Sequence, residues 1–275
     1  MQYPIINLIS DAYINNGWTG LKSASILPGG YTELDYIESS GTQYIDTGIF
    51  PNGNTKVEMS AYIMERRSGN NQIYNARGNN KYFGFSDYNN RMNLYYGSTW
   101  TNMNKVTDIP YTLYVNQAGD MWSININENQ YNRNGRSISF ISDYSMYIFG
   151  ANSVGNIYEP IQKMRLYYFR IWEDGATLSR NFIPCKRNSD NAVGLYDTVT
   201  NTFFNNSGTG SFIQGNEIVS GIDVIDFVLR LKLPLPHYFP HSVIDALISA
   251  ADGQYTEEEK EILRHYLTPL GIGGI

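Results

Sequence analysis

The sequence feature that most constrains the fold is a succession of short stretches in which apolar and polar residues alternate. In KVEMSAYIM, Val57, Met59, Ala61 and Ile63 fall on one face of an extended strand and the residues between them on the other. Comparable short segments follow, separated by turns rich in Asn, Gly and Asp: KYFGF, RMNLYYG, YTLYVN, MWSININ, RSISFI, MYIFGA and KMRLYYFRIW. Many short strands with almost no helical periodicity predict a mainly β protein, an antiparallel β-sandwich of the jelly-roll type.

The pattern changes near residue 215. Residues 220–223, 242–245 and 256–259 each place a Ser or Thr three positions before an acid and ahead of an apolar run, which is typical of a helix start. We therefore predict three regions: an N-terminal arm (1–27), the jelly roll (28–215) and a small C-terminal α-helical docking module (216–275). Apolar residues spaced along the predicted helices are candidate contacts with a protein partner. They are Ile225, Leu229, Ile262 and Tyr266.

Charge and hydropathy exclude several classes of partner. The net charge is −6 and no Lys/Arg cluster is present, so we expect no nucleic-acid binding. No window approaches the ~18 apolar residues of a membrane-spanning helix, and the first residues lack the positive region of a signal peptide. The single cysteine, Cys185, cannot form an intramolecular disulfide and is expected to be a buried thiol.

Metal and cofactor motifs are incomplete. His237 and His241 are four residues apart, but Pro240 interrupts the helix that would align them. Residues 252–259 resemble the second half of a calcium-binding loop, yet apolar side chains stand where the first oxygen ligands belong. We expect no metal site and no cofactor.

One motif raises the question of catalysis. Glu33, Asp35 and Glu38 form E-x-D-x-x-E, the catalytic pattern of some jelly-roll glucanases. Retaining chemistry needs two carboxyl groups about 5–5.5 Å apart. A regular strand would direct Glu38 away from Glu33 and Asp35, although a bulge could correct this. We also expect this first strand to lie at a sheet edge. We therefore predict that the chain is not an enzyme and keep a glycosidase as the less favoured alternative.

The segment 74–100 is the candidate ligand-binding region. It combines aromatic rings, which stack on the apolar faces of sugars, with Asn and Arg side chains, which hydrogen-bond to hydroxyl groups. Alternatively, the same tyrosines pack the sandwich or an oligomer interface, and the sequence leaves both readings open. The candidate residues are Arg77, Tyr88, Asn89, Asn90, Arg91, Tyr95 and Trp100.

Two blocks of sequence resemble a known family. LPGGYTELDYIESSGTQYIDTGI (27–49) is similar to the opening of laminin-G-like, concanavalin A-like jelly-roll domains of bacteriophage and prophage structural proteins and of some bacterial surface proteins. Residues 163–212, containing RNFIPC and GLYDTVTNTFF, resemble the end of these domains. In this block we expect Phe182 in the core and Pro184 at a strand end or sheet edge. The resemblance implies the fold and a phage setting, and a fold by itself does not define function.

These observations predict a non-enzymatic bacteriophage virion protein: a fibre, a spike, or a capsid or tail decoration. It would be made in the host cytoplasm and located in the virion, and it would present a lectin-like jelly roll to a host surface glycan. Its expected partners are other virion proteins and further copies of itself, for example in a trimer, where repeated weak sites give avidity. The alternative is a free bacterial carbohydrate-binding adhesin or lectin.

Overall fold

The computed structural model describes residues 21–22, 27–66, 69–105, 109–127, 129–133, 135, 138–158 and 161–220. The predicted helices with Ile225, Leu229, Ile262 and Tyr266, and most of the N-terminal arm, lie outside the described residues. Residues 29–216 form one compact unit. In the remaining unit the described strands β1 (Leu21–Lys22) and β21 (Val219–Ser220) pair in parallel. No helix among the described residues is long and apolar enough to cross a membrane.

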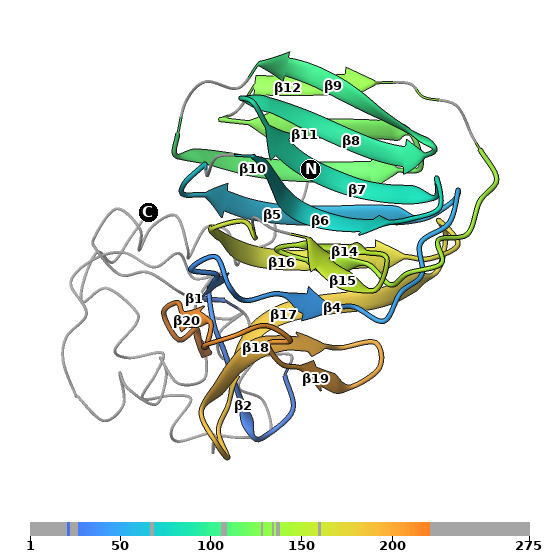
Figure 1. Ribbon diagram of the computed structural model, residues 1–275. Coiled ribbons are helices and arrows are strands. Elements are labelled where there is room, and N and C mark those ends of the chain that lie inside the picture. The colour runs from blue at the N-terminus through green and yellow to red at the C-terminus, as the bar shows by residue number, and fades with distance from the viewer. Residues whose placement is uncertain are drawn as a thin grey trace, which may run out of the picture. The chain divides into compact units, whose positions relative to one another are not determined.

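The compact unit is a β-sandwich of two mainly antiparallel sheets, as predicted, and its described residues contain no helix. The first sheet follows the order β12 (Asn129–Arg133), β11 (Met121–Ile126), β10 (Tyr111–Ala118), β5 (Lys56–Ile63), β16 (Met164–Trp172), β17 (Leu178–Arg187), β18 (Ala192–Asp197) and β19 (Thr202–Phe204), with β2 (Tyr31–Glu33), β3 (Ile37–Glu38) and β20 (Ile213–Gln214) attached. The second sheet follows the order β15 (Asn156–Tyr158), β14 (Ala151–Ser153), β6 (Asn70–Arg77), β7 (Tyr82–Tyr88), β8 (Arg91–Gly97) and β9 (Thr99–Lys105), with β4 (Ile45–Asp46) and β13 (Tyr147–Ile148) attached. In Figure 1, β6 to β9 form a layer over β5 and β10 to β12.

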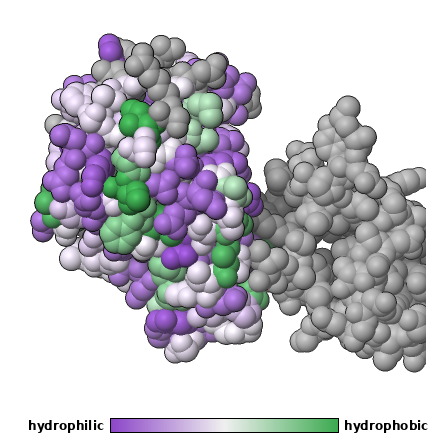
Figure 2. Space-filling model, turned by 90° about the vertical axis from the view of Figure 1, so that its right-hand side faces the viewer, coloured by the Kyte–Doolittle hydropathy of each residue, from purple (hydrophilic) through white to green (hydrophobic). Residues whose placement is uncertain are grey.

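The alternation of apolar and polar residues along the strands directs one set of side chains into the core between the two sheets. The predicted inward face of β5 is buried throughout, and the intervening residues are half-buried. Tyr74 of β6 reaches across the sandwich: its ring centre lies 5.3 Å from that of Phe169 of β16, and its hydroxyl donates to Gln117 Oε1 at 2.7 Å. Burying a large apolar side chain contributes roughly 1.5–3 kcal/mol. Outside the core, hydrophobic residues form separate small patches among hydrophilic ones on the side of the unit shown in Figure 2.

The asparagine pairs are turn residues. Asn89 and Asn90 have φ values of 51° and 62° and form the two-residue connection between Tyr88 and Arg91, which face each other across the hairpin. A two-residue turn with both φ values positive matches the twist of antiparallel strands, and Asn tolerates this conformation better than most residues. The pair 79–80, with φ values of 50° and 57°, lies between β6 and β7.

Our expectation of an edge position for the first strands was wrong for β3, which pairs with both β16 and β20, whereas β2 pairs with β17 alone. β2 pairs with the end of β17, and β3 pairs with the start of β16, so the two strands lie between β16 and β17 where these diverge. Leu34 and Ile37 are fully buried there. Pro184 also lies in this fork, and not at an edge. Its carbonyl accepts the Leu34 amide at 2.9 Å, and β17 has already separated from β16, so the missing N–H breaks no ladder.

Candidate functional site

The acids of the E-x-D-x-x-E motif do not lie on one strand. The chain leaves β2 at Glu33 and enters β3 at Ile37, so simple alternation does not run through the motif. Glu38 pairs with Arg165 Nε at 2.8 Å, and Asp35 Oδ2 accepts the Asn216 side-chain amide at 3.0 Å. Glu33 is buried on β2, in register with Cys185 of β17. The motif therefore lies within the sheet, and Glu38 and Asp35 are engaged by different neighbours.

Cys185 is buried, as predicted. Burial, together with the nearby Glu33 carboxylate, raises the pKa of its thiol to about 12. The group is consequently a protonated thiol at neutral pH and a poor nucleophile or metal ligand. Within the described residues, no three or more His, Cys, Asp and Glu side chains are grouped to hold a metal ion.

The predicted binding residues gather mainly on one face of β6 to β9. Tyr74, Phe85 and Leu94 of these strands point into the core. The register pairs Asn75 with Gly84, Gly84 with Tyr95 and Tyr95 with Trp100, which places these residues together on the opposite surface. We call this surface the outer face. Its described members are Asn70, Gln72, Asn75, Arg77, Tyr82, Gly84, Ser86, Tyr88, Arg91, Asn93, Tyr95 and Trp100.

Aromatic rings surround Arg77 on the outer face. Its guanidinium carbon lies 5.6 Å from the ring centre of Tyr95, 5.9 Å from that of Tyr82 and 4.6 Å from that of Tyr158. Two of the rings on or beside this face are exposed to solvent: Trp100 is 60% exposed and Tyr158 is 37% exposed. Arginine over an aromatic face is attracted by the ring electrons. The structure thus brings the predicted Arg77, Tyr95 and Trp100 to one surface.

Sequence reasoning missed Tyr158 and Tyr82. Tyr158 belongs to β15, which pairs with β14, and β14 in turn pairs in parallel with β6. That connection joins segments about 80 residues apart in the chain, which no local pattern reveals. Tyr82 lies inside the predicted segment, and its alternation with the buried Phe83 could have identified it.

Polar side chains beneath the rings form a hydrogen-bonded layer. The Tyr95 hydroxyl is contacted by Asn70 Nδ2 at 2.5 Å and by Ser86 Oγ at 3.3 Å, each acting as donor. Asn75 Nδ2 donates to Gln72 Oε1 at 2.9 Å. These bonds hold the amides in fixed positions on the sheet, which is how a rigid element prepares a binding surface.

Four buried polar atoms of this layer have no hydrogen-bond partner. They are Asn70 Oδ1, Asn75 Oδ1, Asn93 Oδ1 and Arg77 Nη1. An unpaired buried polar group costs about 1–3 kcal/mol, so native proteins contain few of them. Four on one face indicate a surface whose hydrogen bonds are completed by a ligand or by ordered water.

Gly84 keeps the middle of the outer face free of a side chain. A Cβ atom at this position would lie 2.6 Å from the side-chain Cγ of Asn75 and 2.4 Å from the carbonyl oxygen of Tyr74. Because Gly84 faces Asn75 in the register, its missing side chain leaves room for the Asn75 amide and the β6 backbone.

The hairpin tip is built differently from the rest of the predicted site. Asn90 Oδ1 accepts a hydrogen bond from Arg66 Nη1 at 2.9 Å, and Arg66 also pairs with the buried Asp87 at 2.8 Å. Asn90 therefore has a structural role, and Asn89 shares its turn. Tyr88 and Arg91 flank the turn, are exposed, and belong to the outer face. Five of the seven predicted residues thus share one surface, and the two asparagines shape its end.

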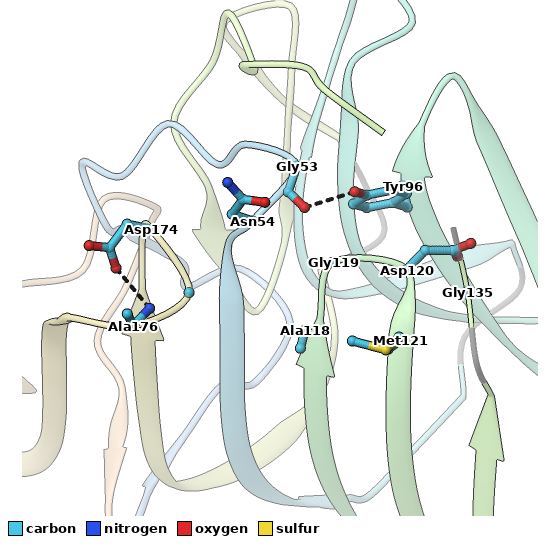
Figure 3. A pocket seen from close by; sticks show the side chains of 11 residues that line it. Gly53, Asn54, Tyr96, Ala118, Gly119, Asp120, Met121, Gly135, Asp174 and Ala176 are labelled. Carbon is cyan, nitrogen blue, oxygen red and sulfur yellow. Dashed lines mark hydrogen bonds between the residues drawn. The ribbon is translucent and has the colours of Figure 1, made fainter. Parts of the chain in front are cut away.

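A hollow lies among the turns at one end of the strands. It has a volume of about 480 Å³ and is lined by the turns containing Gly53, Gly119 and Gly175. Figure 3 shows Asp120 and Asp174 on opposite sides of it, with the Tyr96 hydroxyl directed at the Gly53 carbonyl. Backbone amides of Thr177 and Ala176 lower the pKa of Asp174. Asp174 and Tyr96 thus hold turns, and the described residues that line the hollow include no arginine and one aromatic ring, so the outer face is the stronger candidate for glycan binding.

Comparisons with known proteins leave the function open. No protein-family model matches the sequence, and no curated protein matches it. Among solved structures, the CBM40 of the Ruminococcus gnavus IT-sialidase, bound to α2,3 sialyllactose, is 13% identical with a TM-score of 0.37, covering 54% of this chain and 92% of that one. A Bacteroides ovatus protein to which carbohydrate binding is provisionally attributed is 11% identical with a TM-score of 0.47, covering 68% of this chain and 62% of that one.

A Trypanosoma rangeli sialidase mutant with trans-sialidase activity is 14% identical with a TM-score of 0.33, and the match covers 44% of this chain. That match spans only 21% of the sialidase chain. With TM-scores this low, the three likenesses decide nothing about what this chain binds. The described residues define a β-sandwich protein with an aromatic and amide-rich outer face.

Proposed function

We propose that this protein is a carbohydrate-binding module that holds glycans on the outer face of β6 to β9. The observation that carries the proposal is the combination of exposed rings, Trp100 and Tyr158, with the half-buried Arg77 among aromatic rings on an amide-rich sheet face. Sugars present an apolar C–H face and a set of hydroxyl groups. Rings can stack on the former, while the polar side chains at the surface of this face, such as Arg77 and Arg91, can hydrogen-bond to the latter and fix the orientation of the ligand.

We also propose that the module binds glycans without cleaving them. The described members of the outer face include no Asp or Glu, and Asn and Gln side chains cannot act as general acids or bases near neutral pH. The separate surroundings of Glu33, Asp35 and Glu38 support the same proposal, because glycoside cleavage requires two carboxyl groups acting on one bond.

Trp100→Ala and Tyr158→Ala should each weaken glycan binding about tenfold. Loss of one stacked ring removes about 0.5–1.5 kcal/mol beyond the buried area, and about 1.4 kcal/mol corresponds to a factor of ten. The intact chain would be screened on a glycan microarray, and the best ligand would be titrated calorimetrically into each variant. Phe50→Ala is the matched control, because Phe50 is 47% exposed and lies outside the strands of this face.

Three results would contradict these proposals. Absence of binding to every glycan on the array would remove the binding function. Equal losses in Phe50→Ala and Trp100→Ala would remove the assignment to the outer face. Recovery of cleaved glycan after incubation, with less cleavage in Glu38→Gln, would overturn the proposal that the protein is not an enzyme.

For the biological setting, we propose that the module is carried on a bacteriophage particle and contacts a host surface glycan. The resemblance of residues 27–49 and 163–212 to jelly-roll domains of phage structural proteins motivates this setting. Self-association, for example as a trimer, would multiply a weak site. Mass spectrometry of density-banded, nuclease-treated particles should then detect this chain at a fixed ratio to capsid protein. Its presence only in the soluble fraction would instead favour the free bacterial lectin.

A further inference from the structure

The seven arginines whose side chains the structure describes fall into two groups. Five of them have a carboxylate partner: Arg66 with Asp87, Arg165 with Glu38, Arg170 with Glu58, Arg180 with Asp197, and Arg187 with Asp190. Arg77 and Arg91 have no such partner within the part of the chain that the structure describes. Both belong to the outer face of β6 to β9.

Two acids near these arginines are already paired: Asp87, which is close to both in sequence, and Asp143, which contacts the turn between β6 and β7. Asp87 points into the sandwich and binds Arg66 and Tyr111. Asp143 accepts from Lys81 Nζ at 2.6 Å and from Asn79 Nδ2 at 2.9 Å. The described members of the outer face are neutral or cationic, although the whole chain has a net charge of −6. The face is therefore locally positive.

Arg77 is also held in a geometry suited to an anion. Its guanidinium carbon lies within cation–π distance of the rings of Tyr82, Tyr95 and Tyr158, which hold the group without forming a hydrogen bond to it. Nη1 is buried and donates no hydrogen bond. A guanidinium edge matches a carboxylate in shape and charge, and stacking restricts the side chain before a ligand arrives. Arg77 as a residue is only half-buried, so a ligand can reach it from solvent.

We infer that the outer face selects glycans that contain a carboxylated sugar, with Arg77 binding the carboxylate and the neighbouring rings packing against the sugar. This inference rests on the proposed carbohydrate-binding function and narrows its ligand class. Arg91 adds positive charge at the hairpin end of the same face. The neutral amides of Asn70, Asn75 and Asn93 lie on the same face and add no negative charge to it.

The test compares neutral, uronic acid-containing, sialylated and sulfated glycans on one array with the intact chain. We expect the carboxylated classes to bind best and their affinity to fall about 10–100-fold in Arg77→Gln, the loss expected for a charged hydrogen bond. Arg77→Lys should recover part of this loss, because the charge remains and the planar fork is lost. Arg187→Gln is the matched control, since Arg187 also stacks on a ring, that of Phe203 at 4.6 Å, but lies on β17.

A second measurement changes the ligand and leaves the protein intact. Chemical reduction of the carboxylates of the best-binding glycan to alcohols should abolish most of its binding to the unaltered chain. Binding that is confined to neutral glycans, or equal before and after reduction, would overturn the inference and leave the proposed function standing. Arg77-dependent binding of sulfated glycans only would overturn the carboxylate assignment. Absence of all glycan binding would remove the proposed function itself.

Discussion

Asp197→Ala should lower the free energy of unfolding by about 3–5 kcal/mol, the range for breaking a buried ion pair by removing one partner. Asp197 is completely buried at the end of β18. Its carboxylate accepts the Asn181 amide at 2.8 Å, the Val199 amide at 3.1 Å and the Thr200 hydroxyl at 2.6 Å. Arg180 Nε lies 3.6 Å away. Truncation leaves these donors without an acceptor and the half-buried arginine without its counter-charge.

Urea unfolding followed by tryptophan fluorescence measures this loss. The matched control is Asp190→Ala, because Asp190 forms an exposed pair with Arg187 at 2.6 Å. Exposed pairs contribute little, so the unfolding midpoint of the control should not change measurably. Equal midpoints for Asp197→Ala and the unaltered chain would show that the aspartate in the GLYD segment does not hold the closing strands together.

Local sequence patterns predict the parts of this fold that depend on neighbouring residues. Alternation identifies β5 and its buried face, because the direction of a side chain on a strand depends only on its position. The asparagine pairs predict tight turns, because few other residues accept positive φ. Phe182 is fully buried, as predicted, and Tyr196 faces Phe203 across the turn that Asp197 holds.

Long-range pairing is the part that the sequence does not reveal. Nothing near Leu34 indicates that β2 and β3 fill the fork between β16 and β17, because those partners lie more than 100 residues further along the chain. Tyr158 joins the outer face through two successive strand pairings. The structure thus places five of the seven predicted residues on one surface and adds Tyr158 beside them, and the assignment of this surface to ligand binding stays a prediction.

The sequence left two readings of the tyrosines open: packing holds for one set of them, and ligand binding stays a prediction for the other. Tyr74, Tyr96 and Tyr111 are buried and pack or hydrogen-bond inside the sandwich. Tyr88 and Tyr158 are exposed on or beside the outer face, where a ligand can reach them. Strand alternation separates the two sets, since a tyrosine one position along from a core residue points outward.

A buried ionic network below the hairpin tip predicts the second large effect. Asp87 is fully buried, pairs with Arg66 at 2.8 Å and accepts the Tyr111 hydroxyl at 2.9 Å. Burial raises the pKa of Asp87 more than Arg66 and Tyr111 lower it. The folded chain therefore binds this proton more tightly than the unfolded chain does. The contribution of this proton to the free energy of unfolding is fully present below the pKa of about 3.9 in the unfolded chain. It is lost as the pH rises through the pKa of Asp87 in the folded chain.

Arg66→Ala removes the counter-charge of Asp87, so the pKa of Asp87 in the folded chain should rise further. The stability that its bound proton provides should then be lost at a higher pH. At pH 7 the variant should be about 3–5 kcal/mol less stable than the unaltered chain, because an ionised carboxylate is left buried without a cation. Near pH 4 the difference should be much smaller, because Asp87 is then protonated in the folded variant. Urea unfolding at several pH values between 4 and 8 measures both differences.

The double variant Arg66→Ala/Asp87→Asn separates charge from packing. If the buried carboxylate causes the loss, replacing it with an amide should remove most of the pH dependence that Arg66→Ala introduces. A loss of the same size at pH 4 and pH 7 would instead show that Arg66 acts mainly through its contact with Asn90, which it reaches at 2.9 Å. In that case the arginine would stabilise the hairpin end of the outer face directly, and glycan binding would weaken in both variants.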